Sequence, residues 1–536
     1  MAEVTDRLRV APPVSAVPSW LNWAGWLPAV GIPTMLAALH MQLYGRWIVD
    51  DAAITFAYAR SLASGEGAVL QPNADPVEGY SNPAWLAVLV LGRWLGLFDR
   101  GAWFGVPDLV VFPKIVALLC CAGIFAGFYA VARVVSRRPM LLTVVAGAAT
   151  AAVPSFVIWV SSGLENPLLA LVTVTVAAVL ARAAVAGRLL EVQVAVGCGL
   201  LAALAALTRP DGLIYAAVYP FAVLLLPQPA RVARAALAVV VSTVAFAVPA
   251  SAYLAWRLST FGEYLPNTAL AKAQGLPTAE ELNRPSELVA YTGWLTVVLV
   301  VGVIAAAMWL RGNGRTVLAM LLVPLGLAIA AFAVLEADWM GEYRFATPVW
   351  PLTALAASVA GAQVLPQLTL RARAAAAVLA LVAAGLTGLG WASAAEMFRQ
   401  APMVPMCAVA QNIGATVNGF ADILGVPDGT LATPDAGGSA LTSQFEIIDI
   451  AGLTSAPIAR FWRTGDMPGL RDYMFDDMRP AFIETHGVWS EHTGLVTDPR
   501  MTADYVPVYL TDDHSGWWVR RDLVPSQERL ASAAEW

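Results

Sequence analysis

Two adjacent carboxylates, Asp50 and Asp51, follow the first long apolar run of the 536-residue chain and begin a helical pattern. Apolar residues recur one turn apart from Ile54 to Leu62, and Gly65 ends the pattern. An ionised Asp is costly in hydrocarbon, so the pair belongs at a membrane surface or in a wet cavity. We expect Asp51 to cap the helix and Asp50 to act in a site as a base or acceptor-orienting group. The alternative is that both are helix caps.

Glu78 lies between the two apolar segments that follow this pair and could supply a further catalytic carboxylate, with a structural role as the alternative. Three basic residues, Arg209, Lys272 and Arg344, stand in loops beside other apolar runs. Lys272 is one of only two lysines in the chain. Arginine binds phosphate bidentately and lysine binds it as a point charge, so we expect a phosphate site. The alternative is that the three neutralise nearby acids, namely Asp211, Glu263 and Asp338.

The same loops hold further candidates for substrate binding, each with a cap, turn or membrane anchor as its alternative. These candidates are Tyr80, Glu165, Asn267, Asp338 and Trp339. No metal is required, although Asp50 and Asp51 together could hold a divalent cation. In the last part of the chain, we interpret the turn at Gly437 and Gly438 as structural. The three histidines there lack metal-ligand spacing and are interpreted as surface residues: His486, His492 and His514.

Long apolar segments must position these residues, because 58% of the chain is hydrophobic and its mean hydropathy is +0.66. Such a composition is typical of a polytopic membrane protein, and the absence of a basic stripe excludes nucleic-acid binding. We expect about eleven membrane-spanning helices, each with about 20 apolar residues. They are predicted at 23–45, 107–133, 140–160, 166–186, 192–208, 212–227, 235–256, 289–310, 316–335, 346–365 and 373–394.

The shorter apolar run from Pro83 to Phe98 carries Arg93, and we expect it to lie on the outer surface without crossing. Arg7 and Arg9 then share one side, the cytoplasmic side, with the other arginine-rich loops. Those loops contain Arg137, Arg138, Arg182, Arg188, Arg231, Arg234, Arg311, Arg315, Arg371 and Arg373. The candidate site residues and the last part of the chain are therefore expected outside the cell.

The predicted division is a cytoplasmic segment 1–22, a transmembrane domain 23–395 with a first outer loop 46–106, and an outer domain 396–536. From Ala401 onward, 18 acidic and eight basic residues give a local charge of −10, which leaves +4 for the first 400 residues. Short apolar runs broken by Gly, Pro and Asp predict a small α/β or α+β domain there. The runs are Thr430–Thr433, Ile447–Ala451, Ala503–Leu510 and Gly516–Val519.

The loop motifs resemble those of GT-C glycosyltransferases, multi-span enzymes that use polyprenyl-phosphate sugars as donors. The matching segments are Asp50–Arg60, Glu78–Pro83, Leu207–Gly212, Leu265–Thr268, Asp338–Trp339 and Arg344–Phe345. Together with the outer domain, they are most similar to the actinobacterial arabinofuranosyltransferase B group. The chain is shorter than expected for that group, chiefly after residue 396.

This resemblance implies transfer of arabinofuranose from decaprenyl-phosphoryl arabinose to cell-wall arabinan. It implies that Asp50 or Asp51 acts on the acceptor, assisted by Glu78, while the three basic residues bind the lipid phosphate. No cofactor is implied. The alternatives are a mannosyl- or other pentosyl-transferase, a lipid or sugar transporter, and a membrane anchor for a glycan-binding domain. Few charges lie inside the predicted spans, which counts against a transporter.

Overall fold

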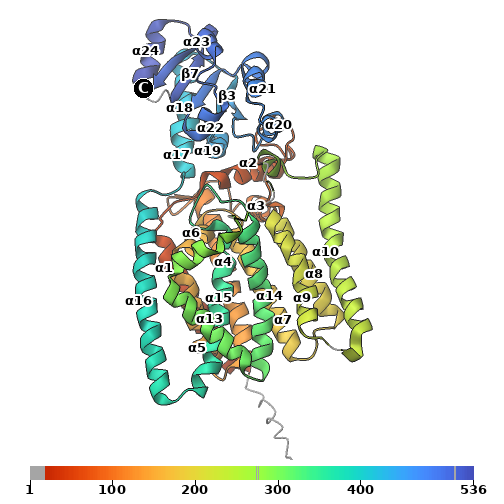
Figure 1. Ribbon diagram of the computed structural model, residues 1–536. Helices are drawn as coiled ribbons and strands as arrows, with labels where there is room; N and C mark the ends of the chain where they lie inside the picture. Colours follow the sequence, from red (N-terminus) through yellow and green to blue (C-terminus); the bar gives the residue numbers. More distant parts are fainter. Residues whose placement is uncertain (1–18, 228, 273–274, 276, 280, 512–514) are drawn as a thin grey trace, which may run out of the picture.

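A bundle of long helices carries a smaller α/β domain on one end (Figure 1). This computed structural model describes residues 19–536 except 228, 273–274, 276, 280 and 512–514. Most of the segment 1–22, with Arg7 and Arg9, and also His514 thus lie outside the described residues. The predicted fold class, a helical membrane-type bundle followed by a small domain with a β-sheet, is confirmed.

Apolar helices form the bundle, and each predicted span coincides with one helix or with a broken pair. The long helices are α1 (Ser19–Gln42), α4 (Asp108–Val135), α5 (Pro139–Ala152), α7 (Asn166–Val185), α8 (Val192–Thr208), α10 (Val232–Phe261), α13 (Trp294–Trp309), α14 (Asn313–Val334), α15 (Val349–Val364) and α16 (Leu370–Gln400). The shorter ones are α6 (Pro154–Ser161), η1 (Pro210–Ala217), α9 (Val218–Leu225) and α12 (Pro285–Thr292).

Length and composition qualify fewer helices as spans than the sequence predicts. Within the described residues, six helices are long and apolar enough to cross a membrane, or up to eight if each bent pair is one span. Val192–Thr208 and Pro210–Leu225 are apolar helices of only 10–17 residues and are not among the six. The predicted number of eleven therefore stays a prediction.

Two helices break where the backbone cannot continue regularly. α5 and α6 meet at 77° around Pro154, whose ring removes a helical N–H donor. α12 and α13 meet at 105° around Gly293, which has a φ of 88° that L-residues with a side chain rarely adopt. Both breaks turn a short helix at the domain end of the bundle across the direction of the longer one (Figure 1).

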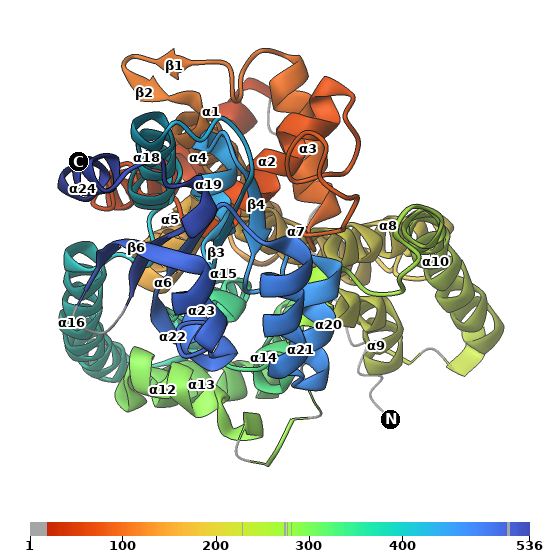
Figure 2. The ribbon, with the colours of Figure 1, turned by 90° about the horizontal axis from the view of Figure 1, so that it is seen from above.

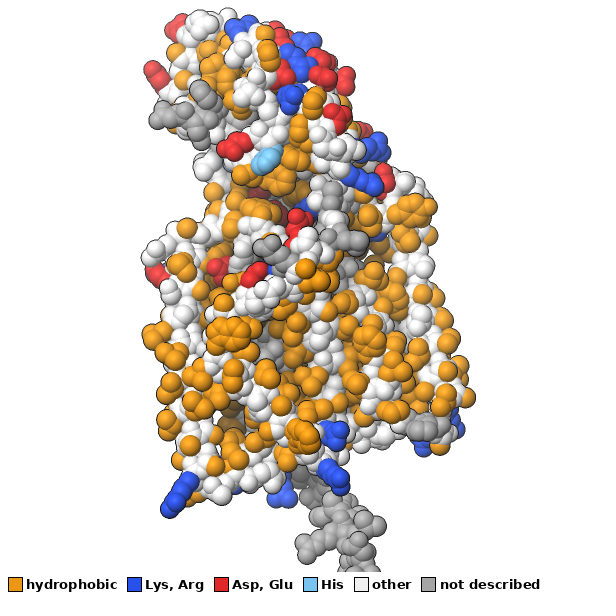
Figure 3. Space-filling model, viewed as in Figure 1, with side chains coloured by type: hydrophobic (Ala, Val, Ile, Leu, Met, Phe, Trp, Pro, Cys, Tyr) orange, Lys and Arg blue, Asp and Glu red, His pale blue; other side chains and the backbone are white. Residues whose placement is uncertain are grey.

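The outer surface of the bundle is apolar, whereas charged side chains gather on the small domain and at the far end of the bundle (Figure 3). α10 and α16 lie at opposite sides of the bundle (Figure 2) and bury few of their residues. Large side chains such as Leu237, Val244, Leu381 and Leu389 are exposed on them. A surface of this kind suits contact with lipid rather than water.

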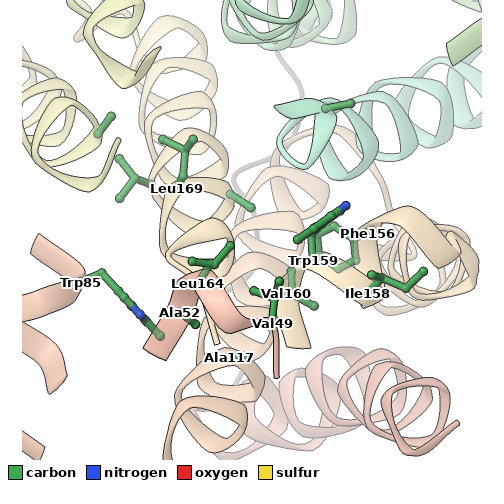
Figure 4. Close-up of a cluster of buried hydrophobic side chains, with 14 of the residues drawn as sticks. Val49, Ala52, Trp85, Ala117, Phe156, Ile158, Trp159, Val160, Leu164 and Leu169 are labelled. Carbon is green, nitrogen blue, oxygen red and sulfur yellow. The ribbon is translucent and has the colours of Figure 1, made fainter. Parts of the chain in front are cut away.

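Helices α2 (Asp50–Ser64) and α3 (Pro83–Trp94) lie between the bundle and the small domain (Figure 1). α2 is almost wholly buried, and Val49 and Ala52 at its start lie close to Val160 and Leu164 (Figure 4). Gly163 permits this approach, since a Cβ there would lie 2.9 Å from a methyl carbon of Ile48. The start of α2 is thereby fixed against the bundle. A short hairpin, β1 (Ala102–Trp103) and β2 (Val106–Pro107), precedes α4.

The small domain contains one five-stranded mixed sheet in the order β4-β3-β5-β7-β6. Its strands are β3 (Thr430–Thr433), β4 (Glu446–Asp449), β5 (Phe482–Thr485), β6 (Tyr505–Leu510) and β7 (Gly516–Arg520). Its helices are α17 (Met406–Val409), α18 (Thr416–Leu424), α19 (Ala436–Thr442), α20 (Ala456–Thr464), α21 (Met467–Asp472), α22 (Gly487–Thr493), α23 (Pro499–Asp504) and α24 (Gln527–Glu535). β3, β4 and β5 are parallel, and β7 is antiparallel to β5 and β6. Four strands match predicted runs, and β5 was not predicted.

Polar contacts join the small domain to the bundle along what we call the docking seam: the contacts made by Asp50, Gln71 and Asn267 with the domain. The Gln71 side chain donates to the Phe445 carbonyl at 3.2 Å and accepts from the Ile447 amide at 2.8 Å. β4 is an edge strand, so the side-chain amide of Gln71 pairs with backbone groups that no neighbouring strand can reach. The seam thus holds the domain over the end of the bundle.

Candidate active site

A cavity of about 520 Å³ lies where α2, the bundle loops and the small domain meet. Its charged lining residues are Asp51, Glu165, Arg209, Asp211, Lys272, Glu336, Asp338 and Arg344. They come from segments far apart in the sequence, namely α2, the turn before α7, the start of η1, α11 (Asn267–Lys272) and the segment between α14 and η4 (Arg344–Ala346). Its volume is typical of a small-molecule site.

Asp51 is the residue of the Asp pair that lines the cavity. No hydrogen bond or ion pair engages its carboxylate within the part of the chain that the structure describes. Burial raises the pKa of this carboxyl, and the neighbouring charges of Lys272 and Arg344 oppose that shift. A carboxylate with unused acceptors and a raised pKa can take a proton from a bound hydroxyl.

Asp50 faces away from the cavity, so the predicted orientation of the pair is wrong. Its carboxylate accepts the backbone amides of Gly438 at 2.7 Å and Gly437 at 3.1 Å, at the start of α19. Neither Asp caps α2, because Val49 holds that position without a side-chain hydrogen bond. A Cβ on Gly437 would lie 2.2 Å from the Asp50 carbonyl oxygen, so the glycine is required by close packing. Asp50 therefore belongs to the docking seam.

Glu78 is also placed elsewhere than the sequence predicts. It is 2% exposed, does not line the cavity, and pairs with Arg257 of α10 at 2.5 Å. The Tyr253 hydroxyl donates to the same carboxylate at 2.6 Å. Its oxygens are therefore occupied in holding the first loop against α10, which leaves it poorly placed for proton transfer. The sequence gives no sign of this pairing, since the partners are 179 residues apart.

The two arginines of the cavity are already paired with acids. Arg209 Nε lies 2.8 Å from Asp211 and its Nη1 lies 3.3 Å from Glu165, while Arg344 Nε lies 2.6 Å from Asp338. The ring of Phe345 lies within cation–π distance of both guanidiniums, at 4.7 and 4.9 Å. These contacts fix the two charges in place. Two of the three acids that the alternative interpretation names, Asp211 and Asp338, are among the partners, whereas Glu263 pairs with Arg460.

Lys272 differs from the arginines because its ammonium makes no ion pair or hydrogen bond within the described residues. It ends α11 and is open to the cavity. Desolvation by the surrounding walls lowers its pKa, as does the positive charge of Arg344, and the charge of Asp51 opposes this. A cation of this kind has its donors available for a ligand.

Of the remaining predicted residues, four line the cavity: Tyr80, Glu165, Asp338 and Trp339. Asn267 does not, because its side-chain amide donates to the carbonyls of Gly452 and Leu453 at 2.8 and 2.9 Å. It therefore holds α11 against the small domain. His486 is half-buried rather than a free surface residue, and it lies between Glu484 at 2.7 Å and Asp435 at 3.2 Å.

Sequence reasoning missed several residues of the cavity. Asn82 donates to Glu165 at 2.7 Å and lies in the same loop motif as Tyr80. The small domain adds Leu453, Trp462 and Trp489, for which no local pattern gave a signal. The small domain thus completes the cavity.

The carboxylates of Asp50 and Asp51 do not converge on one point, since the first binds backbone amides and the second faces the cavity. Among the described residues, no group of three or more His, Cys, Asp or Glu side chains is arranged to hold a metal ion. The Asp pair therefore does not fit the divalent-cation site considered from the sequence.

No protein-family model matches the chain, and no curated protein matches it. Solved structures do resemble it. One is ArnT from Cupriavidus metallidurans bound to undecaprenyl phosphate, with a TM-score of 0.51 and 16% identity over 89% of this chain and 88% of that one. Another is the Archaeoglobus fulgidus oligosaccharyltransferase tethered to an acceptor peptide, with a TM-score of 0.51 and 11% identity over 94% and 76% of the two chains. The chain therefore shares the fold of these two proteins.

Proposed function

We propose that the chain is a glycosyltransferase that moves a sugar from a polyprenyl-phosphate donor to a glycan acceptor. The observation that carries the proposal is the presence in one cavity of a carboxylate, Asp51, and an ammonium, Lys272, that are both unpaired among the described residues, beside two fixed arginines. The shared fold supports it, because one of the similar structures is bound to undecaprenyl phosphate.

The reaction needs two kinds of group. The acceptor hydroxyl oxygen forms a bond to the anomeric carbon of the donor sugar, and the bond between that carbon and the phosphate oxygen breaks. The electron pair leaves with the polyprenyl phosphate, and the hydroxyl proton passes to Asp51. Lys272, with Arg209 and Arg344, stabilises the negative charge that develops on the leaving phosphate.

The arginines and the lysine have different parts in this proposal. Arg209 and Arg344 are held by acids and by Phe345, so their charges are largely balanced and they present guanidinium N–H donors in fixed positions. Lys272 has donors that no described residue uses, and it is therefore the direct ligand for the phosphate. Asp51 has a raised pKa, which makes it a better proton acceptor than an ordinary Asp.

Arabinofuranose is the sugar that we propose, with decaprenyl-phosphoryl arabinose as donor and cell-wall arabinan as acceptor, on the strength of the loop motifs described above. Mannose and other pentoses are the alternatives. The test is mass spectrometry of the products that the membrane-embedded protein forms from a panel of polyprenyl-phosphate sugars and a short arabinan acceptor. A mass increase of one pentose is expected only with the arabinose donor.

Asp51→Asn is the matching variant, with Glu191→Gln as control, because Glu191 lies in the exposed loop between α7 and α8 and pairs only with Arg188 among the described residues. We expect transfer to fall by about 10²–10⁴-fold in the first variant and to be unchanged in the second. Normal turnover by Asp51→Asn would overturn the proposal. Vesicle uptake of sugar or lipid without any product would instead indicate a transporter.

We also propose that the cavity and the small domain face the outside of the cell, since the arginine-rich loops favour the opposite side as cytoplasmic. The native cysteines allow a direct test. Cys407 is exposed in the small domain, whereas Cys120, Cys121 and Cys198 are buried. A membrane-impermeant thiol reagent should label Cys407 in intact cells. Labelling only after the cells are permeabilised would contradict this orientation.

A further inference from the structure

Two tryptophans of the small domain form one wall of the cavity. Trp462 of α20 and Trp489 of α22 both line it, and both are half-buried. Their rings meet edge to face, with centroids 5.1 Å apart and an interplanar angle of 88°. The Trp462 indole donates to the Ile450 carbonyl at 2.8 Å, which fixes the orientation of its ring. The pair is therefore a rigid surface.

The charged groups of the cavity belong to the other part of the molecule. Asp51, Lys272 and Arg344 come from α2, α11 and the start of η4, all before the small domain. Asn267 binds the backbone of Gly452 and Leu453 and so holds the small domain against α11. A ligand that fills the cavity must therefore meet the charges of the bundle loops and the two tryptophan rings of the small domain, while Tyr80, Trp339 and Phe345 add aromatic rings on the bundle side.

A sugar ring has this combination of properties. Its hydroxyl groups lie around the rim and hydrogen-bond to charged side chains, whereas its C–H groups form an apolar face. The negative face of an indole ring attracts such C–H groups, and tryptophan provides a large, rigid contact area. A lipid phosphate, in contrast, is matched to the cations, because the negative face of an indole ring does not attract an anion.

We propose that Trp462 and Trp489 form the binding platform for the terminal sugar of the glycan acceptor, so that the small domain is part of the acceptor site. This inference rests on the proposed function. It assigns the polyprenyl phosphate to the cations and the acceptor ring to the tryptophans. Asp51, on the same cavity, is then available to the acceptor hydroxyl.

The test measures transfer by the full-length protein in membranes while acceptor and donor concentrations are varied separately. Trp462→Ala and Trp489→Ala should each raise the acceptor KM by about tenfold and leave the donor KM unchanged. Trp489→Phe should recover most of the loss, because it restores an aromatic face. Val488→Ala is the control, since Val488 is 59% exposed on the same helix and does not line the cavity.

Two results would overturn the inference. A rise in the donor KM alone would assign the tryptophans to the donor sugar. Unchanged KM values with reduced thermal stability would assign them a purely structural role. The proposed function is tested separately, by whether the wild type transfers any sugar. If it does not, equilibrium binding of a fluorescent oligosaccharide to the solubilised full-length protein still tests the platform: weaker binding by both Ala variants supports it, and equal binding rejects it.

Discussion

The docking seam and the charged wall of the cavity are built from the same residue types, but they differ in how many hydrogen-bonding groups are already used. In the seam, the Asp50 carboxylate accepts two backbone amides and the Asn267 amide donates to two carbonyls. On the cavity wall, Asp51 and Lys272 have no such partners within the described residues. Satisfied groups hold domains together, and unsatisfied groups remain available for a ligand.

After Asp51→Asn, Lys272→Met should give the largest effect, because it removes the one cavity cation that no acid holds among the described residues. We expect the kcat/KM for the polyprenyl-phosphate donor to fall by about 10²-fold, since a preorganised charge at the leaving group is lost. Thermal stability should be unchanged or slightly higher, because a desolvated ammonium is removed. Steady-state kinetics with Lys114→Met as the matched lysine control measures this. An unaltered kcat/KM would show that the arginines alone suffice.

Gly437→Ala should disrupt the seam from the other side. The added methyl group would lie 2.2 Å from the Asp50 carbonyl and 2.6 Å from its carboxylate, so the small domain must shift. Each amide that loses its carboxylate partner while still buried costs about 1–3 kcal/mol. Faster limited proteolysis between the bundle and the small domain is the expected readout. Gly361→Ala, at a helical glycine of α15 with open space around it, is the control for the substitution itself.

Glu78→Gln should cost about 1–3 kcal/mol of stability, because it leaves Arg257 without its charged partner in a mostly buried site. A double-mutant cycle with Arg257→Met separates this pair from other effects. The coupling should be large in thermal unfolding and absent from the chemical step. If Glu78→Gln lowered kcat while leaving stability intact, Glu78 would have the catalytic role that the sequence predicts.

The smallest expected effect is a shift in pH dependence. Burial raises the pKa of Asp51, and activity needs its ionised form, so activity should decline with falling pH through a pKa above that of an ordinary Asp. Lys272 lowers the pKa of Asp51, so its removal should raise that pKa and move the decline to higher pH. The residual activity of Lys272→Met, followed by kcat/KM against pH, measures the direction. A move to lower pH would contradict the proximity of the two groups.

Much of the fold follows from the sequence, because runs of apolar residues are strong local signals. Every predicted span falls on a helix or a broken pair, and four of the five strands of the small domain fall on predicted runs. β5 was missed because its four residues, Phe482–Thr485, include Glu484 and Thr485 and so do not form an apolar run. The number of spans stays a prediction, since α8 and α9 are short.

The candidate site was predicted in part. The basic residues and the acid-rich loops were expected together, and Arg209, Lys272 and Arg344 do line one cavity. The sequence could not show which of Asp50 and Asp51 faces the cavity. Neighbouring residues on a helix point in different directions, and the sequence alone does not fix which direction meets the cavity. Which of them meets the cavity depends on Gly437 and Gly438, 387 and 388 residues further on.

The tryptophans of the cavity could not be predicted from the sequence either, because their position also depends on contacts between distant segments. Trp462 and Trp489 reach it only because the small domain docks over α2 and α11, which no local pattern reveals.

The most direct test of this account compares Asp50→Asn with Asp51→Asn in the same membranes, measuring sugar transfer and thermal unfolding for each. We predict that Asp51→Asn loses transfer and keeps its unfolding temperature. Asp50→Asn should unfold at lower temperature and retain transfer at temperatures where it is folded. The opposite assignment, with Asp50→Asn inactive but stable and Asp51→Asn active, would contradict the central claim that the two carboxylates have separate roles.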